Sequence, residues 1–352
     1  MEITKKAVLF LFIVLITGGF YPKTSAGEHL TIIAVGDIMM GSTGPRGLLP
    51  PNDGQDLFKP ISQNLNDGDI IFGNLEGPLL DGGEPSKCRE EKSRFCFEFK
   101  SPTRYGLYLK QTGFNALNIA NNHTLDFGLE GLKSTLETLY AIGIKPVGGK
   151  AIAEFNIYGK KIALVGFSFL SSDYSYSKLE IDKSKEIVRK LKETFDLVVV
   201  SFHGGAEGKS ALLVGNENEI FLGEDRGNVV LFSRSVIDAG ADLVLGHGPH
   251  VLRALEIYNG KLIAYSLGNF LTYGMFNLKG PNGISVILKI KLDLENGEFL
   301  KGLLVPVKLV NGGIPKLDIN KEGIQLLKEL TNNNGNNFNV RISDEGELSR
   351  IQ

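Results

Sequence analysis

Four of the five histidines in this 352-residue chain lie in three short motifs that contain glycine or asparagine and that follow apolar runs. The motifs are ANNHTLDFG with His123, VVVSFHGGAE with His203, and LVLGHGPHV with His247 and His250. Imidazole is the commonest metal ligand and the usual proton-transfer group near neutral pH. Open α/β sheets bind their ligands in loops at the carboxyl ends of strands. The placement of these histidines therefore predicts one chemical site at the end of a sheet.

Acidic and amide side chains stand at the same kind of position. Asp37 follows the apolar run at 30–35, Glu76 follows the run at 69–72, and Asn122 directly precedes His123. Carboxylates, an amide oxygen and imidazoles together suit Mn, Fe or Zn, bound as one or two ions. The predicted metal ligands are Asp37, Glu76, Asn122, His203, His247 and His250. Each residue taken alone also fits a turn, a helix cap or a core-edge position, and only their shared placement favours a metal site.

Further residues complete the predicted chemistry. His123 stands at the same kind of strand end and is a further candidate for the site, because imidazole transfers protons near neutral pH. Glu207, four residues after His203, would orient the substrate or a ligand imidazole. Asn74 and Asn269, which each follow a strand-end glycine, are predicted to bind substrate.

The elements that must position these residues alternate between Val- and Ile-rich runs and helical patterns, which predicts an α/β fold with mostly parallel inner strands. The expected helices cover residues 103–112, 129–141, 178–194 and 228–239, and a long strand covers 284–292. Two expected hairpins, turning at Gly159-Lys160 and Asn259-Gly260, indicate a mixed sheet or two stacked sheets.

The N-terminal 26 residues have the pattern of a signal peptide. Lys5 and Lys6 precede an apolar run of about 15 residues, shorter than the ~20 that span a bilayer, and small residues follow. We expect export, with the protein periplasmic, at the cell surface or anchored to the membrane by this segment; a buried helix is the alternative. In an oxidising compartment Cys88 and Cys96 should form a disulfide, whereas in the cytosol they would be free thiols. The formal net charge of −2 does not suggest a nucleic-acid partner.

The ordered motifs GDIMMG, DIIFGNLEGPL, GFNALNIANNHTLDFG, VSFHGGAE, AGADLVLGHGPHV and IAYSLGNF resemble the CapA family of capsule or poly-γ-glutamate synthesis proteins. The resemblance extends from about residue 32 to 292 and implies a metallophosphatase-like four-layer sandwich, in which helices flank two stacked mixed β-sheets. That domain is expected over residues 27–310, with a C-terminal extension at 311–352 that contains a flexible Asn-rich loop. In the resemblance Glu76, or else Asn74, matches the bridging carboxylate, and the other predicted ligands match the remaining metal-binding motifs. His123 matches the general acid of the third motif, which would protonate a leaving group.

The resemblance implies an exported, metal-dependent hydrolase or transferase that acts on an anionic cell-surface polymer or its precursor, beside membrane-bound polymer synthase components. The chain departs from the expected pattern at three motifs. Met39 stands where the first motif has a histidine, and Gly73-Asn74-Leu75-Glu76 replaces the usual Gly-Asp. In the last motif two residues instead of one separate His247 from His250, and Gly248 stands where many CapA-like chains have a third histidine. A non-catalytic accessory component of polymer assembly or export, with a degenerate metal site, is therefore the alternative interpretation.

Overall fold

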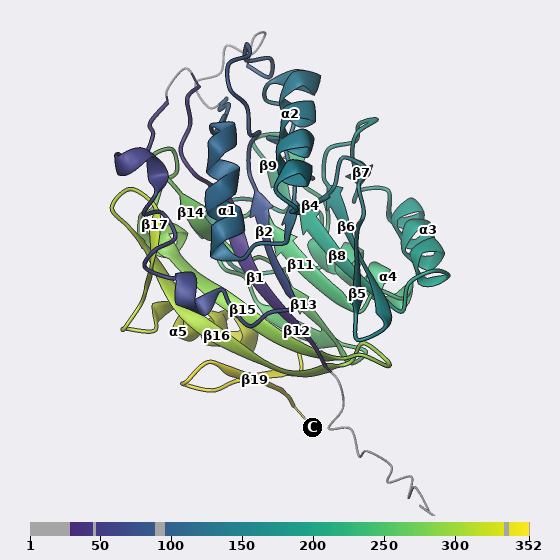
Figure 1. Ribbon diagram of the computed structural model, residues 1–352. Helices are drawn as coiled ribbons and strands as arrows, with labels where there is room; N and C mark the ends of the chain where they lie inside the picture. Colours follow the sequence, from purple (N-terminus) through teal and green to yellow (C-terminus); the bar gives the residue numbers. More distant parts are fainter. Residues whose placement is uncertain (1–28, 45–46, 89–95, 334–337, 352) are drawn as a thin grey trace, which may run out of the picture.

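A computed structural model describes residues 29–44, 47–88, 96–333 and 338–351 of the chain, and the structural statements below refer to these residues. Two mixed β-sheets lie face to face, and helices cover the outer face of each (Figure 1). The predicted signal peptide or anchor at 1–26 lies outside the described residues. In the described part, no helix is both long enough and apolar enough to span a bilayer.

The first sheet has the strand order β18-β19-β16-β15-β1-β2-β3-β4, with β14 paired to β1 and β17 paired to β16. Strands β1 to β4 run parallel to one another, whereas β15 and β16 are antiparallel to their neighbours. Its strands are β1 (His29–Met39), β2 (Ile70–Leu75), β3 (Ala116–Asn118), β4 (Lys145–Val147), β14 (Asn269–Thr272), β15 (Ile284–Asp293), β16 (Phe299–Val310), β17 (Ile314–Leu317), β18 (Val340–Ile342) and β19 (Glu347–Arg350).

The second sheet has the order β12-β13-β11-β8-β6-β5, with β7 paired to β6. Its strands are β5 (Ala153–Ile157), β6 (Lys160–Ser168), β7 (Tyr176–Ser177), β8 (Leu197–His203), β11 (Leu243–His247), β12 (Leu255–Tyr258) and β13 (Lys261–Ala264). Both predicted hairpins are present, as β5–β6 and β12–β13. Asn259 and Gly260 both have positive φ, as the two central residues of a type I′ turn require. A separate two-stranded hairpin consists of β9 (Ile220–Phe221) and β10 (Glu224–Asp225).

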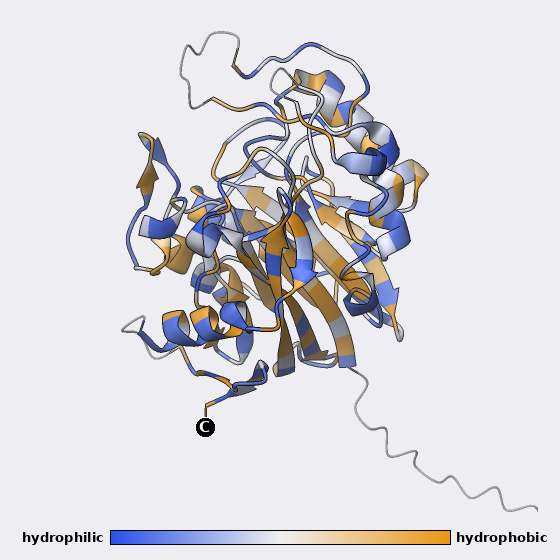
Figure 2. Ribbon diagram, turned by 90° about the vertical axis from the view of Figure 1, so that its left-hand side faces the viewer, coloured by the Kyte–Doolittle hydropathy of each residue, from blue (hydrophilic) through white to orange (hydrophobic). Residues whose placement is uncertain are grey.

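The core is layered because successive strand residues face opposite sides. In β1, Ile32 and Ala34 pack between the two sheets, whereas Ile33 and Val35 face the outer helices. Helices α1 (Gly106–Thr112) and α2 (Gly128–Ala141) cover the first sheet, and α3 (Ile181–Lys192) and α4 (Val229–Asp238) cover the second. In Figure 2 the central strands are mainly hydrophobic, whereas the helices carry both colours. The predicted four-layer sandwich is confirmed.

Element boundaries differ from the sequence expectation at several places. The expected helix at 103–112 begins with a short 3-10 turn before α1, and α3 begins at Ile181 rather than at Lys178. The segment expected as an extension contributes β17, β18 and β19 to the first sheet, and α5 (Glu322–Asn333), which packs against β15 and β16. Most of the Asn-rich loop lies outside the described residues. The 3-10 helices are η1 (Pro51–Gly54), η2 (Ser62–Asn64), η3 (Thr103–Tyr105), η4 (Lys209–Ala211) and η5 (Gly280–Gly283).

Candidate metal centre

Asp37 lies where β1 departs from regular pairing. The register of β1 shifts against β2 between Ala34 and Asp37, and against β14 immediately after Asp37. Gly36 is so close to the backbone of Gly268 that a Cβ atom at residue 36 would lie 2.0 Å from the Gly268 carbonyl oxygen. The Asp37 N–H donates to that same oxygen at 2.8 Å. Glycine at position 36 therefore permits the close backbone approach that holds Asp37 at the site.

Three of the predicted ligands converge between the two sheets. Asp37, Glu76 and His250 are buried, and each offers a ligand atom within 4.8 Å of the others. His250 Nδ1 lies 2.9 Å from Asp37 Oδ2, and His250 Nε2 lies 3.6 Å from Glu76 Oε1. Asp37 and Glu76 belong to the first sheet and its loops, whereas His250 follows β11 of the second. The strand ends of both sheets thus meet at one point.

Several buried polar atoms around this point have no hydrogen-bond partner among the described residues. They are both carboxylate oxygens of Glu76, Oδ1 of Asn122 and Nε2 of His203. Buried polar atoms are nearly always paired, and leaving one unpaired costs free energy. A carboxylate, an amide oxygen and an imidazole nitrogen are all metal-ligating groups. These residues therefore fit a divalent cation.

The charges of the converging groups are strongly coupled. Burial alone would lower the pKa of His250, but Glu76 and Asp37 next to it raise its pKa to about 10. Burial opposes ionisation of Asp37, yet the hydrogen bond and charge of His250 bring its pKa below the ordinary value. Burial raises the pKa of Glu76 well above its ordinary value. At neutral pH an imidazolium at His250 compensates the buried Asp37 carboxylate, and a cation that took its place would displace that proton.

His123 belongs to a hydrogen-bonded dyad at the side of this cluster. Its Nδ1 lies 2.7 Å from Asp126 Oδ2, and its Nε2 points toward the cluster, 3.9 Å from Glu76 Oε1. The ring of Phe99 stacks on the imidazole at 4.1 Å, and the Phe99 N–H donates to Asp126. Burial lowers the pKa of His123 well below its ordinary value, so this imidazole is neutral. Burial also raises the pKa of Asp126 to about 7, against the nearby charge of Lys87.

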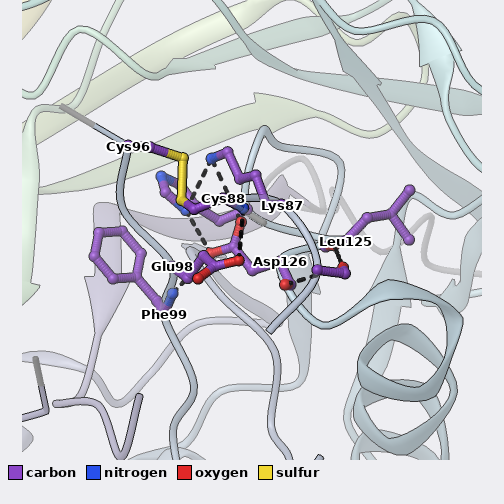
Figure 3. The surroundings of a disulfide bond; sticks show 9 residues. Lys87, Cys88, Cys96, Glu98, Phe99, Leu125 and Asp126 are labelled. Atoms are coloured by element: carbon purple, nitrogen blue, oxygen red, sulfur yellow. Dashed lines mark hydrogen bonds and ion pairs between the residues drawn. A yellow bond between two sulfur atoms is a disulfide. The ribbon is translucent and has the colours of Figure 1, made fainter. Parts of the chain in front are cut away.

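The disulfide predicted between Cys88 and Cys96 is present and lies next to this dyad (Figure 3). The Cys88 N–H donates to Glu98 Oε1 at 2.8 Å. Lys87, the neighbour of Cys88, places its ammonium 3.4 Å from Asp126 Oδ1 and 3.5 Å from His123 Nδ1. The disulfide segment therefore brings a cation to the dyad.

Above the cluster lies a cavity of about 770 Å³. Asn122, His123, Glu207 and His250 form part of its wall, as do Lys87 and aromatic side chains. Glu207 Oε2 lies 3.8 Å from His250 Nε2. The cavity is large enough for a small-molecule or oligomer end group, because ligand pockets typically measure ~300–1,000 Å³.

Other predicted site residues lie beneath the cavity and hold their neighbours. His247 is fully buried, with Nε2 3.1 Å from the Val35 carbonyl oxygen and Nδ1 3.5 Å from Ser201 Oγ, and it is not in the converging group. Asn74 is also fully buried, and its amide donates to Asp37 at 2.8 Å and lies 3.4 Å from His203. These side chains brace the cluster.

Asn269, predicted to bind substrate, is buried and donates to the carbonyl oxygens of His250 and Asn282. It thereby holds the backbone that carries His250. Neither Asn74 nor Asn269 is in the cavity wall.

Among the residues that sequence reasoning missed are Asp126, which pairs with His123, and Lys87 and Arg226, which lie in the cavity wall. Asp126 stands three residues after His123 in the same motif, and that spacing was a usable signal. Lys87 is recognisable only through its neighbour Cys88. Arg226 follows the short β9–β10 hairpin, a segment with no periodic pattern that would draw attention to it.

Comparison with known proteins gives the family. Residues 31–273 match the family described as "Bacterial capsule synthesis protein PGA_cap". The chain is 29% identical to "Capsule biosynthesis protein CapA" of Bacillus anthracis, over 78% of this chain and 70% of that protein. It is 30% identical to "PGA biosynthesis protein CapA" of Bacillus subtilis (strain 168), over 71% of this chain and 65% of that protein. The match thus spans about two thirds of the length of these relatives.

Among solved structures, a phosphatase of Mycoplasma pneumoniae aligns with a TM-score of 0.49 and 14% identity, over 84% of this chain and 96% of that one. A putative 5'-nucleotidase of Staphylococcus aureus aligns with a TM-score of 0.49 and 15% identity, over 86% of this chain and 58% of that one. The family match covers more than half of the chain and contains every residue of the cluster. The chain belongs to the PGA_cap family of bacterial capsule synthesis proteins, the CapA family of its sequence motifs.

Proposed function

We propose that this protein is an exported, metal-dependent hydrolase or transferase that acts on an anionic capsule polymer, of the poly-γ-glutamate kind, or on its precursor. The observation that carries the proposal is the convergence of Asp37, Glu76 and His250 at a cavity, with both Glu76 oxygens unpartnered. The polymer comes from the relatives, since one of them is named a PGA biosynthesis protein.

Asp37, Glu76 and His250 would hold the cation, with Asn122 and His203 as further ligands through their unpartnered atoms. When bound, such a cation polarises a carbonyl or phosphoryl oxygen and lowers the pKa of a coordinated water. Asn74 keeps Asp37 and His203 in place from below. In this proposal His247 braces the strand ends and Glu207 orients His250 and the substrate.

His123 and Asp126 would deliver the proton. Because burial raises the pKa of Asp126 to about 7, a protonated carboxyl is available near neutral pH. In that state Oδ2–H donates to His123 Nδ1, and the ring proton sits on Nε2, which points toward the cluster. The dyad would then give this proton to the leaving group, and Asp126 would resupply it.

One observation favours the second candidate, a non-catalytic accessory component. Met39 takes the place of the first-motif histidine, and its thioether sulfur accepts from the Gly41 N–H at 3.3 Å within the core. A buried thioether is a poor ligand for a hard cation. Two relatives in Mycobacterium tuberculosis are named probable polyglutamine synthesis accessory proteins.

The deciding experiment measures metal and turnover separately. The protein is purified without chelator, its Mn, Fe and Zn contents are determined, and the cleavage or transfer of a γ-linked glutamyl oligomer is followed by product size. The His123→Gln variant should keep its metal and lose turnover, whereas Asp37→Asn should lose metal. Near-zero metal in the wild-type protein, after incubation with each cation, would reject the catalytic proposal in favour of the accessory one.

A further inference from the structure

Arg226 is a nearly buried cation in the cavity wall. Its side chain is 4% exposed, and the guanidinium lies 4.1 Å from the centroid of the Phe169 ring. Nη1 donates to Glu207 Oε1 at 2.9 Å. The other edge of the guanidinium, Nε and Nη2, donates to Glu224 at 3.0 and 2.8 Å. An arginine edge held against an aromatic ring is a preorganised carboxylate-binding group.

The two partners of Arg226 are held very differently. Glu207 is 21% exposed and extends on toward His250, whereas the Glu224 side chain is 53% exposed on the β9–β10 hairpin. Water and salt screen the exposed carboxylate of Glu224 more than the carboxylate of Glu207. Of the two partners, Glu224 is therefore the one that another carboxylate can displace more readily.

The base of the hairpin stays fixed when Glu224 leaves. Glu219, which precedes β9, forms an ion pair at 2.7 Å with Arg253, a fully buried arginine. Arg226 N–H donates to the Glu219 carbonyl oxygen, and the Arg226 carbonyl accepts from the Gly205 N–H at 3.0 Å. These contacts hold Arg226 in the wall without any help from Glu224.

We propose that Arg226 is the specificity-determining residue for a substrate carboxylate, and that Glu224 occupies this subsite as an internal stand-in until substrate displaces it. The γ-carboxylate of Glu224 has the same chemistry as the free carboxylates along a glutamyl chain. Through Glu207 the subsite is one side chain away from His250 of the candidate metal centre. A carboxylate on Arg226 would thus anchor the chain beside the cluster.

This inference deepens the proposed function and rests on it for the identity of the substrate, but its test needs no turnover. A fluorescently labelled short γ-linked glutamyl oligomer is titrated into the full chain at low ionic strength, and binding is followed by anisotropy. Glu224→Gln should tighten binding about twofold to fivefold, since it frees the guanidinium edge. Arg226→Gln should weaken binding tenfold or more, and Arg226→Lys should recover only part of the loss.

The matched control is Glu217→Gln, which removes the same charge from an exposed position of the same segment. It should leave binding unchanged, and Glu224→Gln should give no gain in the Arg226→Gln background. Equal gains from Glu217→Gln and Glu224→Gln, or unaltered binding in folded Arg226 variants, would overturn the proposal. A Glu224→Gln variant that bound inorganic phosphate more tightly, but not the oligomer, would also overturn it. Metal content, measured on the same samples, tests the metal centre independently, because Arg226 is not among the converging ligands.

Discussion

Replacing Glu76 with glutamine tests whether Glu76 is a metal ligand or a structural carboxylate. Both carboxylate oxygens of Glu76 are buried and have no hydrogen-bond partner among the described residues, and burial raises the pKa of Glu76 well above its ordinary value. A carboxyl whose pKa is higher in the folded than in the unfolded state stabilises the folded protein at pH values below its unfolded-state pKa. That contribution is lost as pH rises through the folded-state pKa. Glutamine cannot ionise. Glu76→Gln should therefore leave the metal-free protein at least as stable as the wild type near neutral pH, and should remove this part of the pH dependence.

The metal-bound protein should behave in the opposite way. A cation at 100 times its dissociation constant stabilises a protein by about 2.7 kcal/mol, or roughly 5 °C in Tm for a domain of this size. Loss of one carboxylate from the converging set should weaken binding about 100-fold or more. The same cation concentration would then contribute only ~0.4 kcal/mol, which is less than about 1 °C.

Thermal unfolding with and without Mn²⁺ measures both effects, and Glu256→Gln is the matched control. Glu256 is equally buried but accepts hydrogen bonds from Arg234, at 2.7 and 3.1 Å, and from Tyr265. Removing its charge should cost about 2–3 kcal/mol in the metal-free protein and leave the metal-induced shift intact. If Glu76→Gln destabilised the metal-free protein as much as Glu256→Gln, or kept the full metal-induced shift, Glu76 would be a structural group.

Three further predictions concern other parts of the molecule. Activity that needs the protonated His123–Asp126 dyad should fall as pH rises through about 7. In a pH–rate profile, Asp126→Asn should abolish this decrease and lower turnover about 10–100-fold. The reason is that the asparagine amide donates to His123 at every pH but supplies no proton. Lys178 is buried with no hydrogen-bond partner in the described chain, and burial lowers its pKa to about 7. The contribution of the neutral amine to stability is therefore lost as pH falls from about 10.5 to 7. Lys178→Met should stabilise the protein by about 2 kcal/mol in urea unfolding at pH 7 and have little effect above pH 10.5. Reduction of the Cys88–Cys96 disulfide should cost roughly 2–3 kcal/mol by the same assay, and a Cys88→Ser, Cys96→Ser double variant that lost nothing would contradict this.

The sequence predicted the elements whose patterns are local. The hairpins and α4 are such cases, since Asn259-Gly260 requires a type I′ turn and Asn228 caps α4 by accepting from the Leu231 N–H. Strand β16 was not predicted, because Gly302 and Pro306 interrupt its apolar pattern and most of its side chains are at least partly exposed. Its place in the sheet comes from antiparallel pairing with β15, the strand directly before it in the sequence, across the turn at 294–298.

The site was predicted as a set of residues and not as a geometry. Strand ends indicated where Asp37, Glu76 and His250 would meet, because parallel strands end at the same edge. They could not show that His247, three residues before His250, turns to the Val35 carbonyl while His250 faces the cluster. That difference depends on a left-handed backbone at His250, which a non-glycine residue adopts only when its surroundings impose it.

The first sheet is built from both ends of the chain, since β1 to β4 come before the second sheet in the sequence and β14 to β19 come after it. Its central strand β1 stays without its antiparallel neighbour β15 until nearly the whole chain has been synthesised. Such non-local pairing slows folding and leaves a strand edge open to association in the meantime. Asp37 and His250, 213 residues apart, likewise meet only in the nearly complete fold. A ribosome-bound or truncated chain that ends before β11 therefore lacks the converging group of Asp37, Glu76 and His250, so the chemistry of this group becomes available only in the compartment in which folding finishes.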